Sequence, residues 1–432
     1  MLLLCLLVVV GAAYSNSSEA AAPAPLEWMT ETVVADDGAG DDRFGNAIAV
    51  DGDTAVIGAF DAKIGDNYYQ GAAYVLIRQN GSWTQAQKLV ASDGAGMANF
   101  GSAVAISGDT ILVSATGANV DGHSLQGAVY VFHDIDGTWT ETQHFSSSDG
   151  GSGDSFGNAI ALDDSTALIG AKGATVDGNT LQGKAYIFAS SEGVFSETQI
   201  LQADDGAGND LFGQSVALEG ATAIVGAPTF TYNFQHAGWA YVFTNPGGTW
   251  TQAQKIVPDD SALGDQFGYA VGLSGDTALA SATGNQFAHG AAYVFKNDGS
   301  SWTQQQKLAP SDSASGDEFG NTLAISGTTA VVAAERIMIG EHQGAAYVFA
   351  ATDGTWAQTD EFTEDAGTSL DFFGGSVAFD GATVAIGTPG ATIDGHQFQG
   401  SASFYAHGDD GIFCAGFEAG DGGSCAAARA QH

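Results

Sequence analysis

Basic residues are scarce in this chain. Its 432 residues include only 11 Lys and Arg against 50 Asp and Glu, which gives a formal net charge of −39 at pH 7. Nucleic-acid binding needs clustered cationic side chains that neutralise phosphates, so this class of partner is excluded. Charged residues of either sign make up only 14% of the chain, against roughly 25% in an average globular protein. The acidity therefore comes from few side chains, nearly all of one sign.

Long hydrophobic runs are also nearly absent. The exception, MLLLCLLVVVG at residues 1–11, is too short to cross a bilayer and is typical of a secretory signal peptide. We predict a signal peptide over residues 1–22, no transmembrane segment after its removal, and a secreted or cell-surface location. The usual basic region is missing before the apolar run, and the alternative is a wrongly assigned start on a cytoplasmic protein.

Cysteine is limited to three residues. Cys5 falls in the predicted signal peptide, which leaves Cys414 and Cys425 in a Gly-rich tail over residues 407–432. Two thiols without neighbouring ligands do not make a tetrahedral metal site. In an exported protein they predict a disulfide between Cys414 and Cys425.

Aromatic residues, in contrast, are plentiful. The chain has 25 Phe, 12 Tyr and 7 Trp to bury, which argues against disorder, and its 61 Gly lack the three-residue period of collagen. The dipeptide Phe-Gly recurs at intervals of 52 to 56 residues, beginning at Phe44, Phe100, Phe156, Phe212, Phe267, Phe319 and Phe373. The chain is therefore a sevenfold internal repeat.

Each repeat contains four short apolar segments separated by tight turns such as Asp51-Gly52-Asp53. Alternation near period two, together with these turns, predicts antiparallel strands, and no helical spacing extends over a useful length. A four-stranded unit repeated at this period predicts a β-propeller, whose blades bury their faces against their neighbours. We therefore predict an all-β fold with one seven-bladed β-propeller of four-stranded antiparallel blades over residues 26–406.

The last repeat lacks a fourth strand of its own. Six repeats end in a strand with an aromatic residue near its start, at Trp83, Trp139, Phe195, Trp250, Trp302 and Trp356. The N-terminal segment from Trp28 to Thr32 has the same pattern as the segment that begins at Trp139. We predict that it completes the last blade and closes the ring, which removes exposed sheet edges. The alternative is an open solenoid.

The repeats resemble the FG-GAP repeats of integrin α-chain propellers, and more closely the short variety found in exported bacterial proteins. Phe-Gly is present in all seven units, whereas Gly-Ala-Pro is intact only at Gly226-Ala227-Pro228. The resemblance implies a seven-bladed propeller that binds partners rather than catalysing reactions. The calcium loop of integrin-type repeats, Asp-x-Asp-x-Asp-Gly, is absent, because the first hairpin of each unit is too short to wrap an ion.

Acidic, Gly-rich loops connect one repeat to the next. One interpretation is that each Asp caps turn amides through its short side chain. The other is weak divalent-cation binding by carboxylates gathered on one face, so calcium remains a candidate although no cofactor is required. The candidate ligands are Asp37, Asp41, Asp149, Asp154, Asp205, Asp210, Asp260, Asp265, Asp312 and Asp317.

The loop between the second and third strands varies most, and it should emerge on the same face as the acidic loops. Variable loops on a regular scaffold are where binding residues usually lie. The candidate binding residues are Tyr68, Tyr69, Phe230, Tyr232, Phe234, His236, Arg336 and Phe398. Histidines recur in the same loop at His123, His236, His289, His342 and His396. The alternative is that the aromatic rings pack on neighbouring loops and the histidines bond their own turns.

No Ser, His and Asp combination, phosphate loop or paired Cys-x-x-Cys site can be assembled from the sequence. We therefore expect an exported, non-enzymatic propeller that binds a protein or glycan ligand at its loop face, for example in adhesion. Two alternatives stay open. One is an extracellular enzyme acting on polysaccharide at the same face, and the other is a structural envelope protein.

Overall fold

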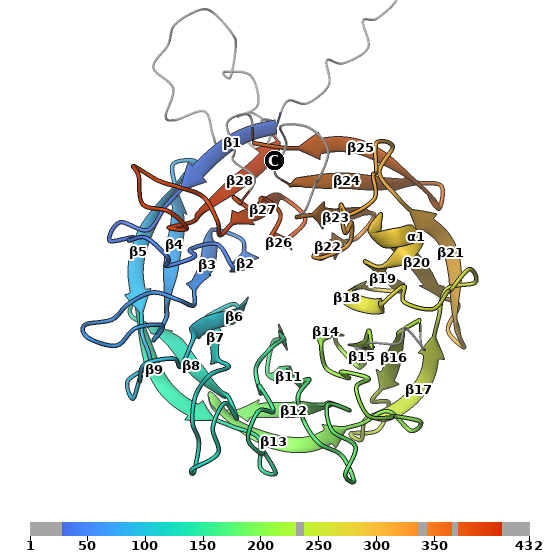
Figure 1. The fold of residues 1–432 in the computed structure, drawn as a ribbon, viewed down its shortest axis with the longest axis horizontal. Helices are drawn as coiled ribbons and strands as arrows, with labels where there is room; N and C mark the ends of the chain where they lie inside the picture. The colour runs from blue at the N-terminus through green and yellow to red at the C-terminus, as the bar shows by residue number, and fades with distance from the viewer. Residues whose placement is uncertain (1–27, 230–236, 336–343, 365–369, 408–432) are drawn as a thin grey trace, which may run out of the picture.

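The computed structural model describes residues 28–229, 237–335, 344–364 and 370–407, and it shows a seven-bladed β-propeller (Figure 1). Seven four-stranded antiparallel sheets surround a central axis. The predicted signal peptide and the tail with Cys414 and Cys425 lie outside the described residues, apart from His407. The predicted all-β fold and blade number are confirmed.

The strands fall into four sets according to their distance from the axis. The innermost strands are β2 (Ala47–Asp51), β6 (Phe100–Ser107), β10 (Ile160–Asp163), β14 (Ser215–Glu219), β18 (Phe267–Ser274), β22 (Leu323–Ser326) and β26 (Ser376–Phe379). The second strands are β3 (Thr54–Ala59), β7 (Thr110–Ala115), β11 (Thr166–Ala171), β15 (Thr222–Ala227), β19 (Thr277–Ala282), β23 (Thr329–Ala334) and β27 (Thr383–Thr388). The third strands are β4 (Ala72–Gln79), β8 (Ala128–Ile135), β12 (Lys184–Ser191), β16 (Trp239–Thr244), β20 (Ala291–Asn297), β24 (Ala345–Thr352) and β28 (Ser401–His407). The outermost strands are β5 (Ser82–Leu89), β9 (Thr138–Phe145), β13 (Val194–Leu201), β17 (Thr251–Ile256), β21 (Trp302–Leu308), β25 (Thr355–Phe362) and β1 (Trp28–Val33).

We number the blades in chain order, so that blade 1 is β2–β5 and blade 7 is β26–β28 with β1. A short helix, α1 (Asn285–Ala288), lies between β19 and β20 of blade 5. Within the described ranges, no helix has both the length and the apolar character needed to cross a membrane.

Burial follows the position of a strand in its blade. Second strands are buried at nearly every position, as in β7, because a neighbouring blade covers each of their faces. Outermost strands alternate instead, as in β5, where Trp83 is buried between two exposed residues. The alternation in the sequence is thus strongest at the rim, where one side of the strand faces solvent.

Each hydrophobic core cluster lies between two blades. One cluster joins Val56 and Val75 of blade 1 to Phe100 and Tyr130 of blade 2, and another joins blade 1 to blade 7. The Phe of every Phe-Gly pair is fully buried. In blade 2 the Phe100 ring meets the Tyr130 ring edge to face, with centroids 5.3 Å apart. Because this packing lies between blades, a single blade cannot bury its own faces.

The Gly of Phe-Gly allows two backbones to approach closely. Gly101 has a φ of +92°, and a Cβ atom there would lie 2.3 Å from the carbonyl oxygen of Ala72 in the preceding blade. The Phe100 amide also donates to the carbonyl of Gln70, at 2.8 Å. Any side chain at this position would therefore separate the two blades.

We expect Gly101→Ala to lower the free energy of unfolding by at least ~2 kcal/mol, because left-handed backbone alone costs an L residue about 1–2 kcal/mol and the methyl group also meets Ala72. Gly108→Ala is the matched control, since its φ is +55° and nothing lies within 4 Å of the added Cβ. Urea unfolding measures both variants. Equal losses of stability would contradict the importance of the close approach.

Reciprocal hydrogen bonds join the outermost strands of neighbouring blades. The Gln143 amide in β9 donates to the Phe195 carbonyl in β13 and accepts from the Phe195 N–H, both at 2.8 Å. The same pair of bonds recurs from Gln87 to Trp139, Gln199 to Trp250, Gln254 to Trp302 and Gln306 to Trp356. These bonds set the spacing of the blades at the rim.

The N-terminal strand closes the ring, as predicted. β1 pairs antiparallel with β28, from Trp28 opposite His407 to Val33 opposite Ala402. The solenoid alternative is therefore wrong. The other six pairs of third and outermost strands contain a register shift, whereas the register between β1 and β28 is continuous. Where blade 7 meets blade 1, Glu31 of β1 takes the place of the Gln that joins the other outermost strands, and its carboxylate accepts the Trp83 N–H at 2.9 Å.

We expect Glu31→Gln to raise the free energy of unfolding by about 1 kcal/mol, because an ionised carboxylate only accepts, whereas an amide also donates to the Trp83 carbonyl. The reverse change at an equivalent junction, Gln143→Glu, should destabilise the protein. Thermal melts at pH 7 measure both. A lower midpoint for Glu31→Gln would show that the closing junction differs from the others in more than this group.

Candidate functional site

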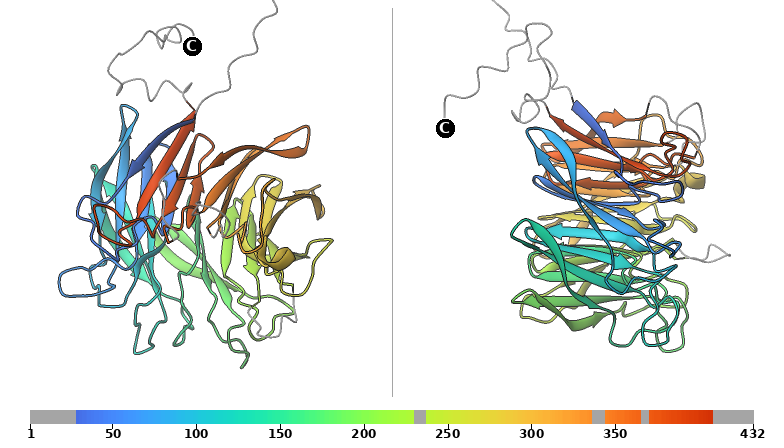
Figure 2. Two further views of the ribbon diagram at one scale, coloured as in Figure 1. Left: turned by 45° about the horizontal axis from the view of Figure 1, so that its top comes forward. Right: turned by 90° about the vertical axis from the view of Figure 1, so that its left-hand side faces the viewer.

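The connections between strands emerge on two opposite faces of the ring (Figure 2). We call the face with the acidic inter-blade loops and the connections from second to third strands the loop face. The two kinds of loop meet there, since the Met97 amide donates to the Tyr68 carbonyl at 2.9 Å. The face with the short hairpin turns is the turn face.

In the described acidic loops, the Asp that directly precedes the Gly or Ser of the turn binds side chains of a neighbouring sheet. Asp149 accepts from the Tyr186 hydroxyl at 2.8 Å and from the Lys184 ammonium at 2.6 Å. Burial raises the pKa of the Asp149 carboxyl, but the bonds from Lys184 and Tyr186 outweigh it and leave the pKa below its ordinary value. Asp37 and Asp205 bind Tyr and Lys in the same way, Asp260 binds Lys307, and Asp312 contributes with burial to the raised pKa of Tyr347.

In five of the acidic loops a later Asp accepts a hydrogen bond from the loop backbone. The Asp154 carboxylate accepts the Gly151 N–H at 2.8 Å, and Asp210, Asp265 and Asp317 accept equivalent amides at 2.7, 2.7 and 2.5 Å. In the first loop this residue is Asp42 rather than the candidate Asp41. The described residues contain no group of three or more His, Cys, Asp or Glu side chains placed to hold a metal ion.

We expect millimolar calcium to leave the thermal midpoint unchanged relative to EDTA, because the described carboxylates already accept bonds from amides, tyrosines and lysines. A site filled at 100 times its dissociation constant would instead add about 2.7 kcal/mol to the free energy of unfolding. Differential scanning calorimetry of the full chain distinguishes the two. A calcium-dependent rise would assign the acidic loops to cation binding.

Four of the connections between second and third strands share one conformation. In blades 1, 2, 3 and 7 a small antiparallel bridge closes the loop, which then ends in a buried Gln followed by Gly. The residue before this Gln has a positive φ, and in blade 1 it is Tyr69, whose carbonyl accepts the Asn99 amide at 3.0 Å. Leu125, Leu181 and Phe398 occupy this position in blades 2, 3 and 7. These four loops vary less than expected, because their backbones hold the next blade.

The structure brings Tyr68 and Tyr69 together at the junction of blades 1 and 2. Tyr68, Tyr69 and Met97 are 63%, 44% and 66% exposed, and we call these three residues the aromatic surface. The Lys63 ammonium lies 4.2 Å from the centroid of the Tyr68 ring. The protein therefore presents apolar side chains to solvent from loops whose backbones are held in place.

Phe398 lies on the neighbouring side, where blade 7 meets blade 1. The Arg43 guanidinium lies 5.0 Å from the centroid of its ring and also pairs with Asp61 at 3.2 Å. Phe230, Tyr232, Phe234, His236 and Arg336 fall outside the described residues, as does His342. His123 and His396 lie in the shared loops of different blades, where their amides bond Val120 and Ile393.

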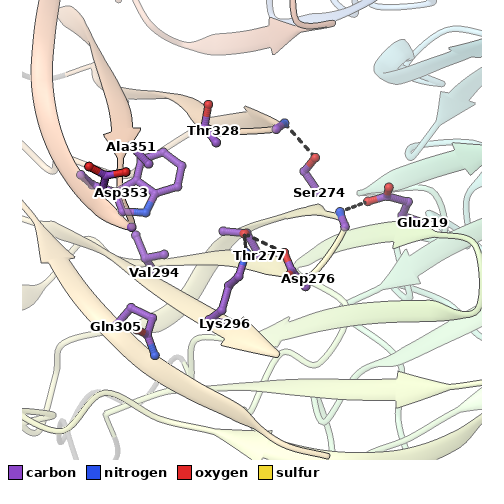
Figure 3. A pocket seen from close by; sticks show the side chains of 14 residues that line it. Glu219, Ser274, Asp276, Thr277, Val294, Lys296, Gln305, Thr328, Ala351 and Asp353 are labelled. Atoms are coloured by element: carbon purple, nitrogen blue, oxygen red, sulfur yellow. Dashed lines mark hydrogen bonds and ion pairs between the residues drawn. The ribbon is translucent and has the colours of Figure 1, made fainter. Parts of the chain in front are cut away.

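A groove of about 550 Å³ lies between blades 5 and 6 on the turn face (Figure 3). Lys296 there bonds Asp276 and Thr277, and the Glu219 carboxylate accepts the Gly275 N–H at 2.7 Å. A second groove, of about 650 Å³, occupies the corresponding place between blades 2 and 3. The grooves therefore form because neighbouring blades diverge on this face. Their charged groups bond to adjacent hairpins and hold them in place.

The central channel contains a hollow of about 460 Å³ lined by the innermost strands of all seven blades. Three positions per blade lie next to one another here, as the bonds between Asn46 and Phe60, Ser102 and Thr116, and Gln266 and Thr283 show, and we call them the mouth positions. The residue before each Phe-Gly has a positive φ and is Arg43, Asn99, Ser155, Leu211, Gln266, Glu318 or Phe372. The residue after each Phe-Gly is Asn46, Ser102, Asn158, Gln214, Tyr269, Asn321 or Gly375. The residue after each second strand is Phe60, Thr116, Lys172, Pro228, Thr283, Glu335 or Pro389.

Sequence reasoning missed these positions as a set. The signal was available, because aligning the seven Phe-Gly pairs shows columns whose chemistry changes from blade to blade beside columns that stay the same. Asn46 and Asn158 use their amides to bond the backbone of the next blade. The other side chains at these positions differ in charge and shape.

Comparison with known proteins identifies the repeat and its architecture. The family model described as FG-GAP repeat matches residues 29–76, 83–132, 139–188, 195–243, 250–295 and 302–349. No curated protein matches the chain. Among solved structures, the chain is similar to a putative 6-phosphogluconolactonase from Bacteroides fragilis, with 12% identity, a TM-score of 0.50, and coverage of 74% of this chain and 85% of that chain. At that identity the likeness concerns the fold alone.

Proposed function

Because this chain belongs to the FG-GAP repeat family, we propose that it is an exported, non-enzymatic module that binds a protein or glycan ligand through the loop face of its propeller. The observation that carries this proposal is the aromatic surface. Tyr68 and Tyr69 are exposed side by side on a loop of blade 1, while the loop between blades 1 and 2 binds the backbone of both.

The backbone of the aromatic surface is fixed before any ligand arrives. The Tyr68 carbonyl accepts the Met97 N–H and the Tyr69 carbonyl accepts the Asn99 N–H, at 2.9 and 3.0 Å. The following residue, Gln70, is buried and accepts the Phe100 N–H at its carbonyl. A rigid loop loses little conformational entropy on binding, and tyrosine supplies contact area with few rotatable bonds. This combination supports the binding of a ligand that presents sugar rings or apolar protein side chains to the aromatic surface.

The uses of the acidic side chains favour binding over hydrolysis. Glycoside hydrolysis uses a pair of carboxylates on either side of a scissile bond. Here Asp37, Asp149 and Asp205 repeat the same bonds to Tyr and Lys around the ring, which is a structural role. The similarity to a protein described as a putative lactonase concerns the fold alone and assigns a role to no residue of this chain.

We expect the double variant Tyr68→Ala/Tyr69→Ala to bind at least tenfold more weakly, a loss of about 1.4 kcal/mol, to ligands found with the wild-type chain on arrays of neutral and acidic oligosaccharides and of extracellular proteins. Thr180→Ala/Leu181→Ala is the matched control, because these residues hold the same loop positions in blade 3.

Surface plasmon resonance on the array hits measures the affinities of all three proteins. The proposal fails if no oligosaccharide or protein on the arrays binds the wild-type chain. It also fails if the two double variants bind equally well.

A further inference from the structure

A cavity of about 360 Å³ lies where blades 3 to 6 meet at the loop face. Much of its wall consists of mouth positions, including Lys172 from blade 3, Gln214 from blade 4, Gln266 and Tyr269 from blade 5, and Glu318 from blade 6. A hollow produced by repeat geometry alone would be lined by the residues that recur in every blade. The wall of this cavity instead combines side chains of different chemistry, each contributed by one blade.

Lys172 differs from the other Lys and Arg residues that the structure describes. Seven described Lys and Arg side chains form ion pairs with Asp, and Lys63 lies over the Tyr68 ring. Within the described part of the chain, Lys172 forms no ion pair, although acidic residues outnumber basic ones 50 to 11. Burial lowers the pKa of its ammonium group. Lys172 is partly buried, and a partly buried cation that forms no ion pair costs free energy, which an anionic ligand group would recover.

The rest of the wall suits a ligand rich in hydroxyl groups. The Thr283 hydroxyl donates to Oε1 of Gln266 at 3.0 Å, so the Gln266 amide nitrogen keeps its donor capacity. Glu318, contributed by blade 6, adds carboxylate oxygens to the wall. Leu211 and Pro228 add apolar surface. The volume lies near the lower end of the range for small-molecule sites, roughly 300–1,000 Å³, which fits a single sugar ring.

We propose that this cavity binds a hexuronic acid residue, with the sugar carboxylate at Lys172 and the hydroxyl groups toward Gln266 and Glu318. The site is separate from the aromatic surface, so this proposal can be tested independently of ligand binding at that surface. The net charge of −39 repels anions at long range, but at physiological salt this repulsion decays over about 8 Å. Inside the cavity the nearby Lys172 charge therefore outweighs it.

Isothermal titration calorimetry of the full chain with sodium glucuronate, and with glucose as the uncharged probe, tests the proposal. We expect saturable binding of glucuronate, at least tenfold tighter than that of glucose. Lys172→Met should weaken glucuronate binding at least tenfold. Lys296→Met is the matched control, because it removes the same charge on the turn face and should leave glucuronate binding unchanged.

Thermal melts report separately on folding. Without ligand, Lys172→Met should melt at or above the wild-type midpoint, since it removes a partly buried cation. Glucuronate should raise the midpoints of the wild type and of Lys296→Met by more than that of Lys172→Met. If Lys172→Met does not fold, Lys172→Gln replaces it in both assays. The proposal is wrong if glucuronate does not bind the wild-type chain, if glucose binds as tightly, or if loss of the Lys172 charge leaves the affinity unchanged.

Discussion

The contact between each Phe-Gly pair and the preceding blade is the interaction on which the propeller depends. A blade is apolar on both faces, so it is stable only when neighbours cover both. Phe100 supplies the buried ring and Gly101 the space for the carbonyl of Ala72 to approach. The hydrogen bond from Phe100 to Gln70 then places the loop of the preceding blade. One dipeptide thus fixes the core, the blade spacing and the base of the loop face.

The scarcity of cations has a structural counterpart. Lys88, Lys184, Lys255 and Lys307, in blades 1, 3, 4 and 5, each pair with an Asp near the start of an acidic loop. In blade 2, His144 lies 3.9 Å from Asp93 in this role. Much of the small supply of positive charge therefore holds loops to sheets. Against this background a lysine that serves no such pair has greater significance for function than it would in a protein of balanced charge.

The architecture could be predicted from the sequence because its determinants are local and repeated. The spacing of Phe-Gly gave the number of blades, and the pattern around Trp28 indicated how the ring closes. The continuous register between β1 and β28 could not be predicted, because it depends on pairing between segments far apart in the chain. The capping role of Asp154 was one of the two interpretations that turn chemistry offered, whereas the bond between Asp149 and Tyr186 needed the packing of two segments. The cavity at Lys172 was hidden for the same reason, since its wall comes from four blades.

The pairing of β1 with β28 also has a consequence for the order of folding. Thr32 bonds Ser403 at 2.8 Å across 371 residues of chain. During synthesis β1 emerges before any blade, and its partner strand emerges after the other six blades. Until then, β1 has no partner strand and blade 7 has an open edge, which is a template for pairing with other chains. Completion of the ring therefore removes the last unpaired strand edge of the propeller. A chain interrupted before β28 would keep the edge of blade 7 exposed.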